Sequence, residues 1–586
     1  MLYTLNRSTL DRVQSGKSQR RQYKIKRQGF LGLLFVLVGL CAFLAFTQQR
    51  EDKFSSLLYG YDWSHISGAT VVKEGVQIMP LNQSIIHQDG SKAQLNPPVN
   101  VRGPHLTFSG DFELSATMHG MEDGASMQLY GQVPIVYDEW RQERPSLRVD
   151  VANKRVEVRI WDGDSATPMD IRSYNVDLKK DVILSVKREN GKILLAADGD
   201  RLGALPDHNI FSDGTIWFGF DGNDKGNGWT LNDLKARPVG NDNLKVVDAP
   251  LLAVSHGDPN SLRNLADKLP RKIPIGVAIS VNPLFTDRSY QNIAMSEFNL
   301  VTLESSIKAQ FIHPAPDKYD FTDADNIIAM AEANNQAVHG HTLVFAKSNP
   351  SWMTDTPKTN LSKVMTEHIT NVVGQYKGRV GSWDVVNEPL SEKDEDYEDG
   401  GLGLRRSFWQ EAMGESYIDQ AFIVARKADP SAKLYLNDYG IEHEGKRWDA
   451  LLALVQRLKS RNVPIDGVGF ESHVYTATDN IDLEILQAHM KILADLGLSV
   501  RVSEIDVTGK DPQFQADQYA GVLSVCISEP SCTSYTTWGV SDLYGSTTIA
   551  DRYPVLLGSS LLWDKDMKPK PAFMALQNVL KGSLNP

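Results

Sequence analysis

The feature that most constrains the fold is in the second half of the chain, where hydrophobic residues alternate between the spacing of a strand and the spacing of a helix. Short apolar runs typical of strands alternate with longer amphipathic stretches, and the alternation recurs about eight times between residues 272 and 586. The clearest helical stretches are residues 323–334, 361–376, 408–429, 446–461 and 483–496. This repetition predicts a closed parallel (β/α)8 TIM barrel of the α/β class, with its active site at the carboxyl ends of the strands.

Two of the predicted strands end in carboxyl side chains. Residues 383–389 read Trp-Asp-Val-Val-Asn-Glu-Pro, and Pro389 cannot continue a strand, so Glu388 stands at the strand end. A second β-branched run, residues 500–507, ends in Glu504 and Asp506. One such carboxyl alone is equally well explained as a structural strand end. Two together supply the proton donor and the nucleophile or base that glycoside hydrolysis requires.

The sequence from about residue 272 to 586 resembles glycoside hydrolase family 10, the family of endo-β-1,4-xylanases. Seven segments carry this resemblance in family order: residues 298–304, 339–344, 383–389, 434–439, 467–473, 503–506 and 537–540. The resemblance implies the same barrel that the alternation predicts. It also implies a retaining endo-β-1,4-glycanase that hydrolyses a polysaccharide by a two-carboxylate double displacement.

The resemblance further implies a role for each polar residue at the barrel rim. Glu388 is expected to be the general acid/base and Glu504 the nucleophile, with their carboxyls about 5–5.5 Å apart. The implied substrate-binding residues are Glu304, Lys308, His341, Asn387, Glu471, His473 and Trp538, and the implied supporting residues are Asp506 and Asn437. Among them, Asn387 is expected to bind the sugar 2-hydroxyl, and His473 to hold Glu504 with Asp506 behind its imidazole.

The sequence departs from the family pattern around the sugar-binding pocket. Ser305 replaces an Asn, Phe345 and Ala346 replace a Trp-His pair, and residues 543–547 lack a second Trp. The residues that break the bond are retained, whereas those that recognise xylose are altered. We therefore expect glycosidase chemistry with a specificity that differs from that for plain xylan.

Glu471 is a further departure, because the family has a neutral Gln at this position. An ionised Glu471 would add negative charge close to both catalytic carboxyls, which favours a protonated Glu388 and opposes a charged Glu504. The alternative is that a nearby Arg or Lys neutralises Glu471 and leaves the site unaffected.

The amino-terminus carries a membrane signal. Residues 1–29 are basic, and residues 30–46 form an uncharged apolar run at the short end of what spans a bilayer. The charge asymmetry predicts a single-pass anchor in the inner membrane, with the amino-terminus in the cytoplasm and the catalytic domain in the periplasm or outside. A cleaved signal peptide and a buried core helix are the alternatives.

Between the anchor and the barrel, the pattern predicts a tether (47–68), a β-sandwich (69–240) and a linker (241–271). Short alternating strands separated by turn signals indicate the sandwich, and its last strands resemble the jelly rolls of carbohydrate-binding modules. Trp161, Trp217 and Trp229 are candidates for stacking on sugar rings, although tryptophans in sandwiches are more often core residues. The domain is thus either carbohydrate-binding or a structural spacer.

Cys41 lies in the predicted anchor, while Cys526 and Cys532 flank Glu529 and Pro530. The spacing of the latter two resembles a disulfide of many family members, and a location outside the cytoplasm permits it. Two free thiols are the alternative.

The net charge of the chain and the motifs that it lacks exclude several classes of binding partner and cofactor. The chain carries −12, and residues 1–29 hold eight basic residues and one acidic residue (+7), so the remainder carries −19. This acidity argues against nucleic acid and polyanionic partners. Metal-ligand clusters, a phosphate-binding Gly loop and a Ser/His/Asp triad signature are absent from the sequence, so no cofactor or metal is expected.

Two functions remain open on the sequence. The first is a membrane-anchored endo-β-glycanase that processes an exopolysaccharide of the bacterial envelope. The second is a catalytically silent carbohydrate-binding protein that keeps the barrel as a scaffold. Retention of Glu388, Glu504, Asn387 and His473 favours the first.

Overall fold

The computed structural model of the protein describes a β-rich region and a barrel. The described residues are 63, 69–79, 83–86, 92–95, 101–131, 146–161, 168–178, 180–212, 214–222, 228–239, 243–246, 253–316, 318–398, 401–475, 480–509, 511–545 and 559–584. The predicted cytoplasmic tail and anchor lie outside them, as does the predicted tether except Trp63. Within the described part of the chain, no helix is long and apolar enough to cross a membrane.

The β-rich region contains two antiparallel seven-stranded sheets. The first has the order β1 (Ala69–Val72), β2 (Gly75–Ile78), β15 (Trp229–Pro238), β6 (Phe112–His119), β11 (Val182–Glu189), β12 (Lys192–Ala197) and β13 (Asp200–Pro206). The second has the order β10 (Asp170–Tyr174), β9 (Arg155–Trp161), β8 (Ser146–Ala152), β7 (Ser126–Tyr130), β14 (Thr215–Asp221), β5 (Val101–Ser109) and β16 (Asn243–Val246). A separate hairpin pairs β3 (Gln83–Ile86) with β4 (Lys92–Leu95).

The two sheets face each other across an aromatic core. Strand β6 alternates buried and half-buried residues, which is the pattern of a sheet with one face in a core. Phe108 of β5 packs edge-on against Phe112 of β6 with ring centroids 4.8 Å apart, and Phe220 of β14 packs against Trp229 of β15 at 6.0 Å. This arrangement is consistent with the predicted β-sandwich.

The three tryptophans proposed for sugar stacking are all buried. Trp229 lies in the aromatic core, and its Nε1 donates a hydrogen bond to the carbonyl of Asp221. Trp217 stacks on His105 with centroids 3.7 Å apart, and the Arg148 guanidinium lies 5.4 Å from the Trp161 ring centre. The core interpretation therefore holds for Trp229, while sugar binding by Trp161 and Trp217 stays a prediction.

The segment predicted as a linker contains regular structure. Strand β16 pairs with β5 and extends the second sheet. Helix α3 (Leu262–Ala266) follows, with Ser261 accepting a hydrogen bond from Asn264 N as its cap.

A closed barrel of eight parallel strands confirms the predicted (β/α)8 fold. Its strands, in order around the ring, are β17 (Ile275–Ile279), β18 (Leu300–Leu303), β19 (Ala337–Phe345), β20 (Ser382–Asn387), β21 (Lys433–Asp438), β22 (Gly467–Phe470), β24 (Ser499–Val507) and β25 (Cys532–Thr537). Strand β25 pairs with β17, which closes the ring. The short strand β23 (His473–Val474) adds to the end of β24.

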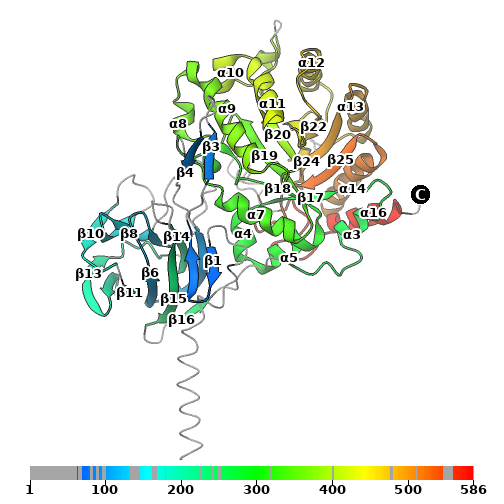
Figure 1. The fold of residues 1–586 in the computed structure, drawn as a ribbon. Coiled ribbons are helices and arrows are strands. Elements are labelled where there is room, and N and C mark those ends of the chain that lie inside the picture. The colour runs from blue at the N-terminus through cyan, green and yellow to red at the C-terminus, as the bar shows by residue number, and fades with distance from the viewer. Residues whose placement is uncertain are drawn as a thin grey trace, which may run out of the picture. The chain divides into compact units, whose positions relative to one another are not determined.

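Helices surround the barrel strands (Figure 1). The main ones are α5 (Arg288–Glu297), α7 (Thr322–Ala333), α9 (Lys358–Gln375), α11 (Ser416–Ala428), α12 (Lys446–Ser460), α13 (Leu483–Asp495), α14 (Pro512–Ser528) and α16 (Pro571–Gly582). Shorter ones are α4 (Val281–Thr286), α6 (Ala309–Ile312), α8 (Ser351–Thr354), α10 (Phe408–Met413) and the 3-10 turn η1 (Asp394–Tyr397). The barrel strands are buried on both faces because side chains fill the interior and helices cover the outside.

Local chemistry explains where several of these helices begin and end. Asp287, Asp482 and Asp511 accept backbone hydrogen bonds as caps of α5, α13 and α14. The single helix predicted for residues 408–429 is in fact two, α10 and α11. Gly414, at φ 60° and ψ −156°, ends α10, because this conformation lies outside the helical region.

A disulfide joins Cys526 at the end of α14 to Cys532 at the start of β25, with its sulfurs 2.02 Å apart. Both cysteines are fully buried. Arg271 donates hydrogen bonds to the carbonyls of Cys526 and Cys532 and so ties this corner to the segment before β17.

Candidate active site

The residues predicted for the site lie at the carboxyl ends of the barrel strands. Their positions are Glu304 after β18, His341 in β19, Asn387 and Glu388 at the end of β20, Asn437 in β21, Glu471 after β22, His473 in β23, Glu504 and Asp506 in β24, and Trp538 after β25. Lys308 stands just before α6. One barrel face thus gathers residues spread over more than two hundred positions of sequence.

Asn437 contacts both proposed catalytic residues. Its main-chain carbonyl accepts a 2.8 Å hydrogen bond from the Glu388 backbone N–H, and its side-chain Nδ2 donates a 2.6 Å hydrogen bond to Glu504 Oε1. The same Nδ2 lies 2.8 Å from Asn387 Oδ1 and 3.1 Å from Glu471 Oε1. The side-chain amide of Asn437 therefore holds three site residues, and its main-chain carbonyl holds a fourth.

Two further residues position Asn437. Ser503 Oγ donates a 2.6 Å hydrogen bond to Asn437 Oδ1, which orients the amide so that Nδ2 faces the carboxyls. Gly469 leaves room for this arrangement, because a Cβ there would lie 2.1 Å from Asn437 Oδ1. Any larger residue at position 469 would displace the amide.

Glu504 is held as a carboxylate. Burial alone would raise its pKa, but His341 and His473 outweigh burial and keep the pKa of Glu504 below its ordinary value. His341 Nδ1 lies 3.7 Å from one Glu504 oxygen, and His473 Nε2 lies 3.4 Å from the other. A charged carboxylate with both oxygens flanked by imidazoles is suited to attack an electrophilic carbon.

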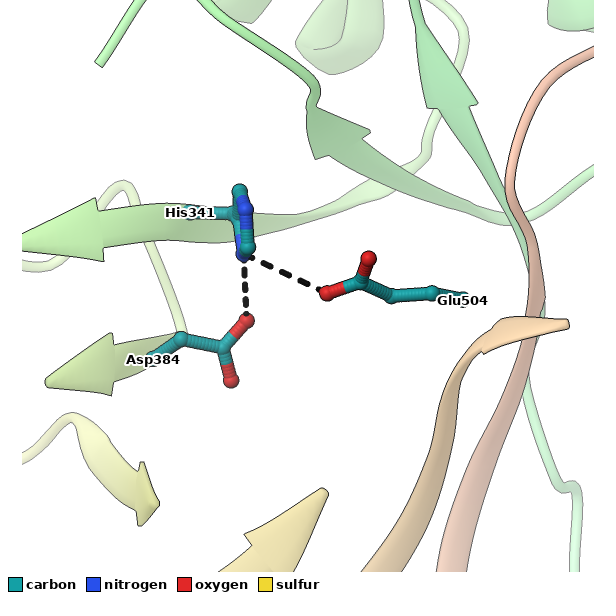
Figure 2. A group of neighbouring side chains, drawn as sticks. All are labelled: His341, Asp384 and Glu504. Atoms are coloured by element: carbon teal, nitrogen blue, oxygen red, sulfur yellow. Dashed lines mark hydrogen bonds and ion pairs between the residues drawn. The ribbon is translucent and has the colours of Figure 1, made fainter. Parts of the chain in front are cut away.

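His341 is in turn oriented by Asp384 (Figure 2). Its Nδ1 lies 2.9 Å from Asp384 Oδ2, and both side chains are almost fully buried. Burial would raise the pKa of Asp384, but His339, His341 and Arg501 outweigh burial and keep this pKa below its ordinary value. The three side chains in Figure 2 thus form a polar chain from strand β20 through β19 to Glu504.

On the other side of Glu504, His473 is held as a cation. Its Nδ1 lies 2.7 Å from Asp506 Oδ1. Burial disfavours a charged imidazole, but Tyr475, Asp506 and Glu471 outweigh burial and hold the pKa of His473 well above its usual range. This contact matches the role that the family resemblance implied for Asp506.

The surroundings of Glu471 favour its protonated form, and among the described residues no Arg or Lys forms an ion pair with it. It is buried, its Oε2 lies 3.4 Å from His473 Nε2, and burial together with the Glu504 charge raises the pKa of Glu471 well above its ordinary value. A protonated carboxylic acid offers an O–H donor beside a carbonyl acceptor, whereas the amide of Gln offers two N–H donors beside its carbonyl. The raised pKa of Glu471 thus favours a neutral group at this position, as in the rest of the family.

Glu304, Lys308 and Trp538 form the opposite wall. Ser280 Oγ donates a hydrogen bond to Glu304 Oε2, and burial raises the pKa of Glu304. The Lys308 ammonium lies 6.0 Å from the Trp538 ring centre, and Trp538 packs edge-on against His341 with centroids 5.1 Å apart. These groups together offer hydroxyl-binding polar atoms beside a flat apolar surface, which suits a pyranose ring.

Glu388 adopts a strained backbone and is contacted by two cations. Its φ is +46°, a conformation that non-glycine residues adopt mainly where the surroundings impose it. Lys347 Nζ lies 3.1 Å and Arg405 Nη2 lies 3.2 Å from the same oxygen, Glu388 Oε2. The two cations therefore hold the Glu388 carboxyl through one of its oxygens.

Two groups of side chains bring potential metal ligands together: His341, Asp384 and Glu504, and Glu471, His473 and Glu504. In the first, His341 Nδ1 and Asp384 Oδ2 lie 2.9 Å apart, the distance of a hydrogen bond. In the second, His473 favours the protonated form, which has no lone pair for a metal. Both groups are better described as hydrogen-bond networks.

The comparisons with known proteins agree with this geometry. The sequence profile of Glycosyl hydrolase family 10 matches residues 261–579, which is more than half of the chain. The chain belongs to glycosyl hydrolase family 10. A β-1,4-xylanase of Dictyoglomus thermophilum is 36% identical over 317 residues, covering 51% of this chain and 86% of that protein. Endo-1,4-β-xylanase B of Thermotoga neapolitana is 32% identical over 334 residues, covering 55% of this chain and 92% of that protein.

A solved structure of the family has the same barrel. It is xylanase 10B of Thermotoga petrophila RKU-1, determined in complex with xylobiose. The match covers 56% of this chain and 100% of that chain, with 34% sequence identity and a TM-score of 0.52. Family membership and these relatives show that the chain is a xylanase-like glycoside hydrolase. They favour the enzyme over the catalytically silent binding protein.

Two of the departures from the family pattern, Phe345 and Ala346, lie beside Glu388. A small pocket next to it is lined by Val344, Phe345, Ala346, Asn387, Glu388, Arg405, Ser407, Trp409 and Tyr417. Trp409 Nε1 donates a hydrogen bond to the Phe345 carbonyl and fixes the end of β19. The altered positions Phe345 and Ala346 therefore shape the space around the proposed proton donor.

Sequence reasoning missed Lys347, Arg405, Asp384 and Ser503. Arg405 lies outside the segments that resemble the family and carries no local signal. Asp384 and Ser503 lie inside such segments, but their roles depend on partners far away in the chain. Lys347 directly follows Phe345 and Ala346, where the sequence departs from the family pattern, and this neighbourhood was a signal that could have pointed to it.

Proposed function

We propose that this glycoside hydrolase cleaves a β-1,4-linked polysaccharide with retention of configuration, using Glu504 as nucleophile and Glu388 as general acid/base. The observation that carries the proposal is the position of Asn437, whose side-chain amide holds the charged Glu504 carboxylate on β24 and whose main-chain carbonyl holds the backbone of Glu388 at the end of β20. Retaining glycosidases require one carboxylate that attacks and one carboxyl that donates a proton.

In the first step, Glu504 attacks the anomeric carbon while Glu388 protonates the departing glycosidic oxygen. In the second, Glu388 takes a proton from water, which attacks the same carbon and releases Glu504. His341 and His473 flank the nucleophile and keep it charged before attack. Asn387, whose Oδ1 accepts from Asn437, is thereby held with its own amide group toward the sugar.

The substrate is proposed to be a β-1,4-glycan other than plain xylan. The xylanase relatives and the xylobiose complex of the Thermotoga petrophila enzyme support a xylan-like backbone. The altered residues Ser305, Phe345 and Ala346 support a difference in side groups. A bacterial exopolysaccharide fits both, and an anchored enzyme is suited to processing a polymer made by the same cell.

The stereochemistry of the first product tests the mechanism. Proton NMR recorded immediately after addition of the full-length protein to a β-1,4-glycan should show the β-anomer of the new reducing end first, followed by slow mutarotation. First appearance of the α-anomer would rule out the double displacement and would indicate an inverting mechanism.

We also propose that residues 30–46 anchor the chain in the inner membrane with the barrel outside the cytoplasm. The basic segment 1–29 before an uncharged apolar run supports this orientation. After fractionation of cells, the full-length chain should sediment with membranes and resist extraction by alkaline carbonate. A soluble form beginning after residue 46 would instead establish a cleaved signal peptide.

A further inference from the structure

Lys347 places an exposed positive charge beside the proposed proton donor. It follows β19 by two residues, and its Nζ lies 3.1 Å from Glu388 Oε2. The side chain is 41% exposed, while that of Glu388 is 13% exposed. The ammonium also lies 5.6 Å from the Phe345 ring centre. One side of Lys347 thus contacts the catalytic residue and the other is open to a substrate.

Arg405 contacts the same carboxyl oxygen but is not open in this way. Its Nε donates to the Glu388 carbonyl at 2.9 Å, and its Nη2 lies 3.0 Å from the Tyr439 hydroxyl and 3.2 Å from Glu388 Oε2. Arg405 also pairs with Glu392 at 3.4 Å. With its donors engaged by protein groups and its side chain 15% exposed, Arg405 is a structural partner of Glu388.

The catalytic cycle changes the charge balance of this group. With Glu388 ionised, the two cations Lys347 and Arg405 face the two carboxylates Glu388 and Glu392. Glu388 has to be protonated to act as general acid, and Lys347 then loses its negative partner. Lys347 is then free to attract another anion, so a negative group supplied by the substrate would be stabilised at this point of the reaction.

We infer that Lys347 binds an acidic substituent, such as the carboxylate of a uronic acid, on a sugar next to the bond that is cleaved. This inference rests on the proposed function and narrows its substrate class to acidic β-1,4-glycans. Phe345 and Ala346, which directly precede Lys347, are smaller than the Trp-His pair that they replace, and both lie beside Glu388.

The charge of the whole chain limits how acidic that glycan can be. The chain carries −12, and the part after residue 29 carries −19, so a dense polyanion would be repelled. One exposed lysine next to the cleavage point instead suits a polymer with occasional acidic groups. We therefore assign the site to a sparsely acidic glycan and not to a polyuronide.

The test compares two forms of one polymer. The probes are glucuronoxylan and the same glucuronoxylan after chemical reduction of its carboxyls to alcohols. Turnover is measured with the wild type, Lys347→Met and Lys347→Arg. Lys358→Met serves as the matched control, because Lys358 makes a comparable 3.0 Å ion pair with Glu411 on the exposed surface. Binding of both polymers is measured separately in the Glu504→Gln background.

The wild type should prefer the acidic polymer by about 10- to 100-fold in kcat/KM, the range expected for one hydrogen bond to a charged group. Lys347→Met should lose this preference, Lys347→Arg should retain most of it, and Lys358→Met should match the wild type. The preference should also decrease with added salt.

Two outcomes separate this inference from the proposed function. Hydrolysis of both polymers with equal kcat/KM and equal binding, or a preference that survives in Lys347→Met, would overturn the anion site and leave the hydrolase intact. Hydrolysis of neither polymer, together with binding that depends on Lys347 and on the carboxyls, would overturn the proposed reaction and leave the anion site standing.

Discussion

Glu504→Ala should reduce turnover of every substrate by roughly 10⁴-fold or more, because no other group can form the glycosyl-enzyme bond. Glu388→Ala should give a divided result. A polysaccharide has a poor leaving group, so loss of the general acid should lower its rate by about 10²- to 10⁴-fold. An aryl glycoside with an acidic phenol needs no protonation, so its first step should be nearly preserved and its glycosyl-enzyme should accumulate.

This result is checked by steady-state and burst kinetics on a β-1,4-glycan and on an aryl β-glycoside. Glu411→Ala, which removes an exposed carboxylate from the pair with Lys358, is the control and should match the wild type. Equal losses on both substrate types for both active-site variants would refute the division of roles. If Glu388→Ala lost activity on every substrate and Glu504→Ala kept the first step on the aryl glycoside, the roles of Glu388 and Glu504 would be reversed.

Glu471→Gln should stabilise the protein increasingly as pH rises. In the folded protein, burial and the charge of Glu504 raise the pKa of Glu471, so the folded state retains a proton that the unfolded state loses above about pH 4.3. The folded state then binds more protons, and the free energy of unfolding falls with pH by up to about 1.4 kcal/mol per unit until Glu471 ionises in the fold. Glu471→Gln has no carboxyl at this position, so its free energy of unfolding should not show this decrease with pH.

The measurement is the free energy of unfolding of wild type and Glu471→Gln between pH 4 and pH 8. The two should be similar at pH 4 and diverge above it, whereas Glu411→Gln should show no comparable trend. The acid limb of the pH–rate profile should remain unchanged in Glu471→Gln, because Glu471 is already neutral there. A shift of that limb to lower pH would show that Glu471 is ionised, as the sequence alone had suggested as one alternative.

Much of the fold was determined by local sequence. The barrel is encoded by repeated strand and helix periods, which require no knowledge of distant contacts. The strand ends also marked Glu388 and Glu504, because a polar residue that follows a buried strand in such a barrel is placed at its rim. The split between α10 and α11 is a case where local sequence was misread, since Gly414 was already visible inside the predicted helix.

Tertiary structure alone decided the electrostatics and the spacing of the site. Asn437 contacts both Glu388 and Glu504 although it lies 49 residues after the first and 67 residues before the second, a relation with no local signature. Lys347 meets Glu388 across 41 residues of sequence. Whether Glu471 carries a charge depends on its burial and on Glu504 and His473, which only the closed barrel brings together. The sequence alone determined which chemical groups stand at the rim, because each follows its own strand. The fold decided which of them touch and which are charged, because both depend on distance and on exclusion of water.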